Sequence, residues 1–139
     1  MADRFSLRVI TPTGVVFEGE AEQVTAVGPI GEFGVLPEHI NFITSLAPGI
    51  LEIRAAEGTR SYVVSGGFAE VKDGAVTILA DGAEQPGAID ASRLDAQLSE
   101  AERRLSESSF YSEEYEGAER DMLLAVARKQ ASELKPASH

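Results

Sequence analysis

The sequence predicts a β-sandwich followed by an antiparallel hairpin of two helices, and two observations lead to this fold class. Twelve of the 13 glycines lie between residues 14 and 87. Glycine supplies the turns of short-stranded β domains and weakens helix interiors, so its near absence afterwards marks a change of architecture. Beyond residue 87 the hydrophobic spacing also changes, from alternation to the pattern of a helix face. We therefore expect two domains, residues 1–86 and residues 87–139.

Short alternating runs predict the strands of the first domain. The first run alternates Phe5, Leu7 and Val9 with Ser6, Arg8 and Ile10, as a half-buried strand does. Turns rich in glycine and proline separate the runs, and no helical pattern lies between them, which favours antiparallel strands in a sandwich over a parallel sheet. We expect the sandwich to end near residue 85. The further expected strands are 15–17, 21–27, 33–36, 41–46, 50–55, 60–64, 68–72 and 75–79.

A first amphipathic stripe predicts one helix of the hairpin. Leu94, Leu98, Ala101 and Leu105 recur at spacings of four, three and four, which places them on one helix face. Two signals compete for its start. Asp90 is a suitable N-cap, whereas Ser92-Arg93-Leu94-Asp95 resembles a capping box, so the sequence sets the start only to within about two residues.

A second stripe predicts the other helix. It begins at Tyr115 and continues towards Leu134, after a polar, serine-rich segment at residues 106–112. Two amphipathic helices joined by a short polar loop form an antiparallel hairpin. Both stripes are narrow and contain alanine, so the pair alone has a thin core and marginal stability. We expect the hairpin to be a movable element.

Composition and charge exclude several classes of function. The 139 residues include 23 acidic and 12 basic side chains, giving a formal charge of −11, and no cysteine. A polyanion repels phosphate backbones and anionic lipid, which argues against nucleic-acid binding and polybasic membrane docking. Without cysteine, disulfides, thiol catalysis and zinc–thiolate sites are excluded. We see no targeting segment and no apolar run long enough to span a bilayer, and we expect a soluble, folded protein.

Candidate catalytic residues are few. Glu38, His39 and Ser65 supply the residue types of a hydrolase, yet no nucleophile elbow is present, and we favour His39 as an ordinary loop histidine. Metal binding is disfavoured because His39 stands alone and the other histidine is at the C-terminus. Two alternatives remain at this stage: a small hydrolase using His39, and a free-standing sandwich adaptor that binds a peptide at a strand edge.

Four segments carry a family resemblance. Residues 31–39 (GEFGVLPEH), followed by NFITSL at 41–46, strongly resemble the signature loop of the epsilon subunit of F-type ATP synthases. Residues 63–71 (VVSGGFAEV) and VTILA at 76–80 agree with that family in order. The resemblance spans the whole chain and implies the same fold, a β-sandwich followed by a helical hairpin.

The resemblance implies a non-catalytic rotor subunit. In this family the sandwich clamps the gamma shaft and sits on the membrane c-ring, so that proton-driven rotation reaches the catalytic head. By position, Glu32 and Phe33 are then the c-ring contacts, and His39 and Thr44 are the gamma contacts. Phe33 and the nearby Leu36 have a second interpretation, as residues that fill the sandwich. The implied location is peripheral, on the cytoplasmic face of a bacterial inner membrane.

The family resemblance also assigns a regulatory role to the hairpin. Folded beside the sandwich it permits turnover, and extended along gamma into the alpha/beta head it inhibits ATP hydrolysis. Arg120, Arg128 and Lys129 are then expected to contact an acidic segment of the catalytic beta subunits. The alternative is that these three cations form a solvated helix face.

Some members of the family bind ATP on the hairpin, and this sequence matches their pattern in part. Leu94 stands where the pattern has alanine, and Glu100 stands where a further arginine is expected. A carboxylate near a triphosphate repels it, so we predict weak or absent ATP binding and no bound cofactor. We favour Asp90 and Arg93 as a helix cap and its first-turn partner. The residues that match the nucleotide pattern are Glu84, Ile89, Asp90 and Arg93.

Overall fold

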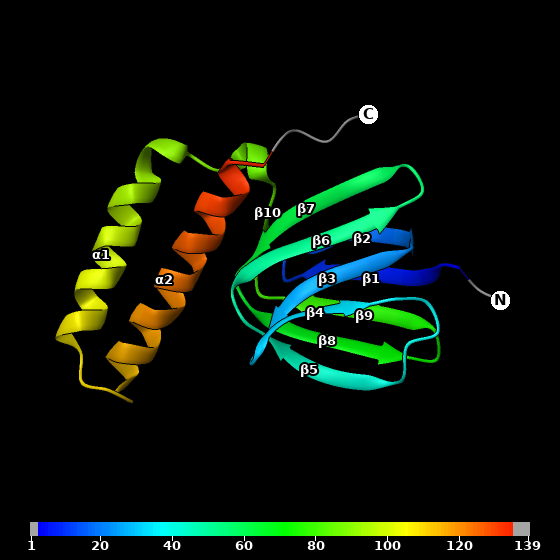
Figure 1. Ribbon diagram of the computed structural model, residues 1–139, viewed down its shortest axis with the longest axis horizontal. Helices are drawn as coiled ribbons and strands as arrows, with labels where there is room; N and C mark the ends of the chain where they lie inside the picture. Colours follow the sequence, from blue (N-terminus) through cyan, green and yellow to red (C-terminus); the bar gives the residue numbers. More distant parts are fainter. Residues whose placement is uncertain (1–2, 135–139) are drawn as a thin grey trace.

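Two layers of strands and a helical pair make up the computed structural model, which describes residues 3–134 (Figure 1). The strands are β1 (Phe5–Thr11), β2 (Gly14–Ala21), β3 (Gln23–Gly28), β4 (Gly31–Val35), β5 (Phe42–Leu46), β6 (Gly49–Ala55), β7 (Gly58–Val64), β8 (Gly67–Lys72), β9 (Ala75–Ala80) and β10 (Ala83–Glu84). Two short 3₁₀ turns, η1 (Pro86–Ala88) and η2 (Ala91–Arg93), lead into helices α1 (Leu94–Glu107) and α2 (Glu113–Ser132).

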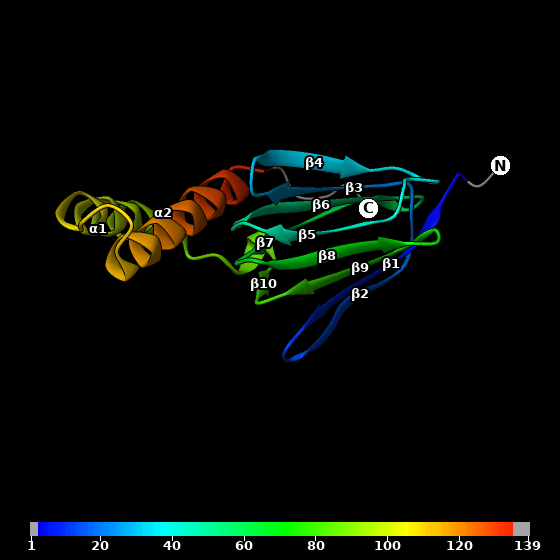
Figure 2. The ribbon, with the colours of Figure 1, turned by 90° about the horizontal axis from the view of Figure 1, so that it is seen from below.

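The strands form two five-stranded sheets that face each other (Figure 2). The first sheet has the order β2-β1-β9-β8-β5, and the second has the order β10-β7-β6-β3-β4. All neighbouring pairs are antiparallel except β1 and β9, which run parallel. The predicted sandwich is thus confirmed, with one parallel pair inside its first sheet.

The core lies between the two sheets. Leu7 and Val9 of β1 face Leu51 and Ile53 of β6 in one cluster, and all four side chains are completely buried. Ile10 and Ile50 apart, the residues next to them along the strands are polar and point outward, which is the alternation seen in the sequence. Burial of each such side chain contributes roughly 1.5–3 kcal/mol to folding. The alternating pattern therefore fixes which face of each strand points inward.

Most strand boundaries lie within two residues of the sequence prediction, and β2 differs most. The strand expected at 15–17 continues as β2 to Ala21, and the strand expected from residue 21 begins at Gln23. β2 is an edge strand that pairs with β1 along its whole length, so Glu18 and Glu20 can stay exposed while the strand continues to the buried Ala21. Ion pairs reinforce the second half of β2, with Arg8 Nε 2.8 Å from Glu18 Oε2. The two-residue strand β10 was not predicted, because it is too short for a periodic signal.

Gly67 allows β8 and β9 to approach closely. Its φ of +138° lies in a region that side chains disfavour, and an added Cβ would lie 2.0 Å from the carbonyl oxygen of Leu79. Phe68, the next residue, stands directly opposite Leu79 in the β8–β9 register. Only glycine fits this position without displacing backbone.

The helix starts follow the capping residues. Asp90 caps η2, accepting hydrogen bonds from the backbone nitrogen of Ser92 at 3.1 Å and from its hydroxyl at 2.6 Å. Asp90 therefore acts as an N-cap, as expected, although of the turn that precedes α1. The alternative capping box is not formed, because Ser92 donates to Asp90 and α1 has no side-chain cap. Ser112 caps α2 by accepting from the backbone nitrogen of Tyr115.

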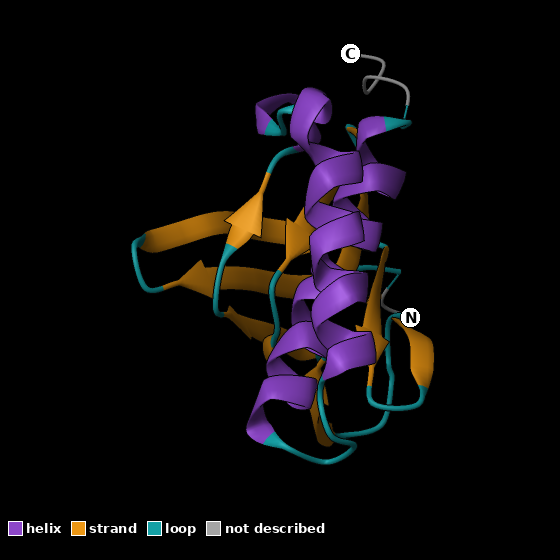
Figure 3. Cartoon of the chain, turned by 90° about the vertical axis from the view of Figure 1, so that its left-hand side faces the viewer, coloured by secondary structure: helices purple, strands orange, loops and turns teal. Residues whose placement is uncertain are grey.

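The two helices form the predicted hairpin at one end of the sandwich, and α2 lies between α1 and the second sheet (Figures 1 and 3). Ala127 and Ala131 of α2 pack on Val63 of β7, with Ile50, Ile89 and Leu124 around them. The hairpin in this structure is folded against the sandwich. Leu134, towards which the second hydrophobic stripe was predicted to continue, lies beyond the end of α2.

Candidate functional site

An apolar row crosses the outer face of the first sheet. The registers of β2, β1, β9 and β8 place Val15, Ile10, Leu79 and Phe68 opposite one another in turn. Val15 is 53%, Leu79 51% and Phe68 57% exposed. A contiguous apolar surface of this kind is typical of a protein that is covered by a partner. We call these four residues the sheet patch.

His39 and Thr44, the predicted gamma contacts, lie outside the sheet patch. His39 is in the connection between β4 and β5, where its Nδ1 donates to the carbonyl oxygen of Ile40 at 3.0 Å. Thr44 alternates with the exposed Ile43 and Ser45 of β5, so it lies on the inward-facing side of that edge strand. Sequence reasoning missed the sheet patch because its members come from four strands. Only the strand registers bring them together.

The residues of the hydrolase alternative are not assembled. Ser65 lies between β7 and β8, at the end of the sandwich that carries the helical hairpin. Its backbone nitrogen donates a hydrogen bond to the carbonyl oxygen of Gly82. The β4–β5 connection, which holds Glu38 and His39, lies at the opposite end of the sandwich (Figure 2). It is anchored there by Asn41, whose amide oxygen accepts from the backbone nitrogen of Asp73 at 2.9 Å. A nucleophile and a base at opposite ends cannot act together.

Glu32 and Phe33, the predicted c-ring contacts, point in different directions from β4. Phe33 is half-buried, packs on the sandwich core and meets Phe42 edge to face with ring centroids 5.9 Å apart. The second interpretation of Phe33, as a residue that fills the sandwich, is therefore the one that its contacts support. For Leu36 the same interpretation is wrong, because that side chain is 55% exposed. Glu32 is exposed. At the tip of the β3–β4 turn, Ile30 is fully exposed, and the sequence analysis did not single it out.

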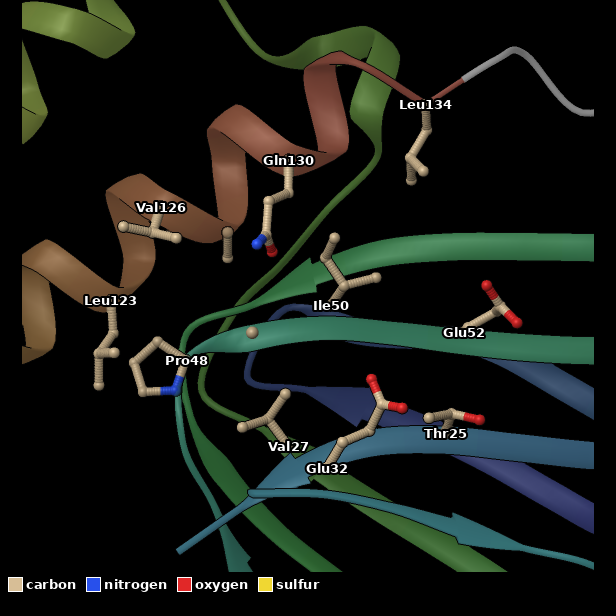
Figure 4. Close-up of a pocket in the computed structure, with 12 residues that line it drawn as sticks. Thr25, Val27, Glu32, Pro48, Ile50, Glu52, Leu123, Val126, Gln130 and Leu134 are labelled. Carbon is tan, nitrogen blue, oxygen red and sulfur yellow. The ribbon is translucent and has the colours of Figure 1, made fainter. Parts of the chain in front are cut away.

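Glu32 also lines a groove between the second sheet and α2 (Figure 4). The groove has a volume of about 410 Å³, with Leu123 and Val126 on its helical wall and with Glu32 and Glu52, from two different strands, on its sheet wall. The folded hairpin therefore lies next to the turn that carries Glu32. Both features occupy the same end of the sandwich.

Two of the three cations predicted to contact the beta subunits are already paired within the chain. Arg128 donates from Nε and Nη2 to one carboxylate oxygen of Glu84, at 2.9 and 2.7 Å. This pair joins α2 to β10 across 44 residues of sequence and is partly buried. Lys129 Nζ lies 3.3 Å from Asp95 on α1. Arg120 is exposed and makes no ion pair with any residue in the range 3–134.

The residues that match the nucleotide pattern have other contacts in this structure. Glu84 holds Arg128, and Ile89 packs in the apolar cluster under α2. Asp90 caps η2, and Arg93 Nε lies 3.5 Å from it. Hydrogen bonds from Ser92, assisted by the charge of Arg93, lower the pKa of Asp90. The favoured interpretation of Asp90 and Arg93 as a cap and its partner is confirmed.

A cleft of about 450 Å³ separates the exposed sides of α1 and α2, and its charges largely neutralise one another. Arg104 Nη1 lies 2.6 Å from Asp121, and Arg128 is held by Glu84. Glu100 also lines the cleft, and a hydrogen bond from Arg103 lowers the pKa of its carboxyl, which keeps it ionised at neutral pH. The cleft therefore offers an anion little unpaired positive charge.

The described residues contain neither a membrane-spanning helix nor a cluster of metal-binding side chains. Between residues 3 and 134, no helix has the length and apolar character needed to span a membrane. No group of three or more histidine, aspartate or glutamate side chains suited to a metal ion occurs in that same range.

Comparisons with known proteins identify the family. A family model described as the β-sandwich domain of the ATP synthase delta/epsilon chain matches residues 4–86. The ATP synthase epsilon chain of Syntrophobacter fumaroxidans is 41% identical over 133 residues, which cover 96% of this chain and 98% of that protein. This chain belongs to the ATP synthase epsilon-chain family. The epsilon chain of an Exiguobacterium species is 39% identical over 130 residues, covering 93% of this chain and 96% of that protein.

Solved structures agree with membership of the epsilon-chain family. A chain in the structure of the Euglena gracilis mitochondrial ATP synthase, OSCP/F1/c-ring, superposes with a TM-score of 0.82 and 27% identity. The match covers 95% of this chain and 83% of that one. A chain of the Tetrahymena thermophila enzyme shares the fold, with a TM-score of 0.63 and 13% identity. As an epsilon-family member, the chain is a non-catalytic component of the central stalk of ATP synthase.

Proposed function

We propose that this chain transmits c-ring rotation to the catalytic head through the gamma subunit, and that its hairpin restrains ATP hydrolysis. The observation that carries the first part is the sheet patch, because a rotor subunit must be held firmly by its shaft. The proposed site of action is the cytoplasmic face of a bacterial inner membrane, as a peripheral part of the complex. The chain itself performs no chemistry in this scheme.

We assign gamma to the outer face of the first sheet. The sheet patch provides the apolar centre of such an interface, and the exposed Ile43 of β5 extends the same face. His39 and Thr44 then contact gamma from the edge of the face, at β5 and the connection before it. A rigid sheet suits this task because it presents its side chains at fixed spacing.

We assign the c-ring to the turn between β3 and β4. Glu32 offers a carboxylate and Ile30 an apolar anchor to the polar loops of the ring, while Phe33 supports the turn from the core side. The turn belongs to the second sheet and the sheet patch to the first. Gamma and the c-ring can therefore occupy the chain at the same time.

We call the inhibition of ATP hydrolysis by the helical hairpin the brake. It requires the hairpin to leave the sandwich. Its contact with the sandwich is small, consisting of the alanine-rich cluster on Val63 and the ion pair between Arg128 and Glu84. On extension, Arg128 and Lys129 exchange Glu84 and Asp95 for carboxylates of the beta subunits. One charge pair then replaces another of the same kind, so the two states stay close in free energy.

Truncation after residue 87 tests the brake. In a complex reconstituted with gamma, the catalytic subunits and the c-ring, removal of the hairpin is expected to raise the rate of ATP hydrolysis. Binding of the truncated chain to gamma should persist, because the sheet patch is retained. An unchanged hydrolysis rate would show that this hairpin is not a brake.

A charge in the sheet patch tests docking. Phe68→Glu places a carboxylate in the exposed row and is expected to prevent co-purification with gamma, whereas Glu57→Lys, in the turn between β6 and β7, should not. Phe68 is more than half exposed, so the sandwich itself should tolerate the change. Co-purification of the Phe68→Glu chain at the normal ratio would contradict the assignment of gamma to this face.

We further propose that ATP binds the hairpin weakly or not at all, because Glu100 is ionised and the cleft arginines are paired. Isothermal titration of the full chain should give little heat with ATP. Glu100→Arg replaces a repulsive charge by an attractive one, so binding by that variant should become measurable. Tight binding by the unaltered chain would overturn this proposal.

A further inference from the structure

The turn between α1 and α2 exposes aromatic rings to which the proposed function gives no role. Phe110 is 64% and Tyr111 82% exposed, although aromatic side chains gain most from burial. The ring of Phe110 lies against that of Tyr111 with centroids 4.1 Å apart, and against Tyr115 at 5.0 Å. We call Phe110, Tyr111 and Tyr115 the aromatic tip. It stands at the end of the hairpin opposite to η1 and the last turn of α2 (Figures 1 and 3).

The backbone holds the aromatic tip in a strained conformation. Tyr111 has a φ of +69°, in the left-handed region that bulky residues avoid. Ser112 fixes this turn on both sides, since its hydroxyl donates to the carbonyl oxygen of Ser109 at 2.6 Å and accepts from the backbone nitrogen of Tyr115 at 3.1 Å. Strain at an exposed aromatic residue brings no gain within the chain. Such outliers concentrate at functional positions.

The charges around the aromatic tip are negative. Glu113, Glu114 and Glu116 occupy the first turn of α2, all exposed, and none forms an ion pair with another described residue. The positive end of the α2 dipole accounts for acidic residues here, but not for exposed rings. The arginines at this end of α1 are already paired, Arg103 with Glu100 and Glu107 and Arg104 with Asp121.

We propose that the aromatic tip is a docking surface for an arginine-bearing surface of a neighbouring protein in the ATP synthase complex. A guanidinium stacks on aromatic faces and pairs with carboxylates, and this tip offers both within one turn. A second copy of the chain is disfavoured, because three carboxylates would face three carboxylates. Anionic lipid is disfavoured for the same reason. The proposal rests on the proposed function only in that the partner belongs to the same complex.

Photo-crosslinking from the tip tests the proposal. Benzoylphenylalanine in place of Tyr111, in the full chain within the assembled complex, is expected to crosslink to a partner peptide containing arginine. The same probe at Phe68 reports whether the sheet patch is docked. Crosslinking at Phe68 but not at Tyr111, or capture of a partner segment without arginine, overturns the aromatic-tip inference alone. Absence of both crosslinks overturns the inference together with the proposed docking.

Binding measurements provide the second test. Tyr111→Ala is expected to weaken the affinity of the chain for the rest of the complex by about 3- to 10-fold, the range expected for loss of one cation–π contact. Tyr111→Phe keeps the ring and should bind as the unaltered chain does. The effect should diminish as salt is added, because the neighbouring carboxylates contribute to it. Equal affinities for the alanine and phenylalanine variants would contradict the proposal.

Discussion

The sandwich and the hairpin bury different kinds of side chain, and the difference separates their roles. The largest fully buried residues of the chain, among them Leu7, Leu51 and Ile53, all belong to the sandwich. In α1 and α2, five of the six buried residues are alanine. A buried alanine removes far less apolar surface from water than leucine or isoleucine does, so it contributes less to stability. The sandwich is the firm part of the molecule and the hairpin the releasable one.

The largest expected effect on stability comes from adding a side-chain carbon at a position of the sandwich that has no space for it. Gly67→Ala brings a Cβ to 2.0 Å from a backbone oxygen at a φ of +138°, so we expect the free energy of unfolding to fall by roughly 3–6 kcal/mol. Gly74→Ala is the control, because its φ of +79° carries the strain without the clash, and it should cost about 1 kcal/mol. Chemical denaturation measures both. Equal losses would mean that the approach of β8 to β9 is not tight.

The next effect compares the two cores directly. Ile53→Ala empties a fully buried position between the sheets and should lower the free energy of unfolding by about 2–5 kcal/mol. Leu105 of α1 is only half-buried, so Leu105→Ala should cost about 1 kcal/mol. If the two losses were similar, the hairpin would be as firmly packed as the sandwich, against the comparison above.

A charge at the contact between the two regions should separate them without unfolding either. Ala127 is 3% exposed against Val63, so Ala127→Asp buries an unpaired carboxylate unless α2 moves away. We expect faster hydrogen exchange in α2 and unchanged exchange in β1 and β9. Arg120→Gln changes the net charge by the same amount at an exposed position of the same helix and should have little effect. Faster exchange throughout the sandwich would show that the two regions unfold together.

The ion pair across the same contact should contribute less. Glu84→Gln removes the charge that holds Arg128, and we expect docking of the hairpin to weaken by about 1 kcal/mol, as for a partly exposed pair. With the brake as proposed, the extended state gains population, so ATP hydrolysis by the complex should fall. A double-mutant cycle with Arg128→Gln isolates the pair. A coupling energy of zero would mean that the pair does not hold the hairpin.

The smallest effect is expected from lowering the pH, which should slightly reduce the helix content. The pKa of Glu100 is lowered by the hydrogen bond from Arg103, so its contribution to the helix is complete above the ordinary glutamate range and is lost as pH falls through the lowered value. Helical circular dichroism of the chain should therefore decline slightly below about pH 4. Glu100→Gln should remove this part of the decline. An identical acid profile for the variant would show that the ion pair adds nothing to α1.

Local pattern accounts for most of the fold that the sequence predicted. Alternation in β1 and β6 and the stripe through Leu94 and Leu105 each depend on residues close in sequence, so they can be read without knowing the rest of the molecule. The parallel pairing of β1 with β9 joins residues some 70 positions apart, and no local pattern encodes it. The strands themselves could therefore be predicted from the sequence, whereas their order and direction in the sheets could not.

The same limit explains what sequence reasoning missed in the candidate site. The sheet patch draws one residue from each of four strands, and the partner of Arg128 is 44 residues away. Family resemblance pointed to Glu32, His39 and Thr44, which lie in or next to one continuous motif. It could not show that the side chain of Thr44 alternates away from the exposed face. A surface assembled from several strands can be found only when the pairing registers of those strands are known.

The parallel β1–β9 pair also constrains how the chain is made. β1 lies between β2 and β9, so an inner strand of the first sheet is synthesised first and one of its two neighbours almost last. While the nascent chain lengthens, β1 and β2 can pair, but one edge of β1 stays open until residues 75–80 leave the ribosome. Long-range pairing of this kind folds slowly. The first sheet of the sandwich can therefore be completed only after β9 has been synthesised, and α2 packs on the sandwich after that.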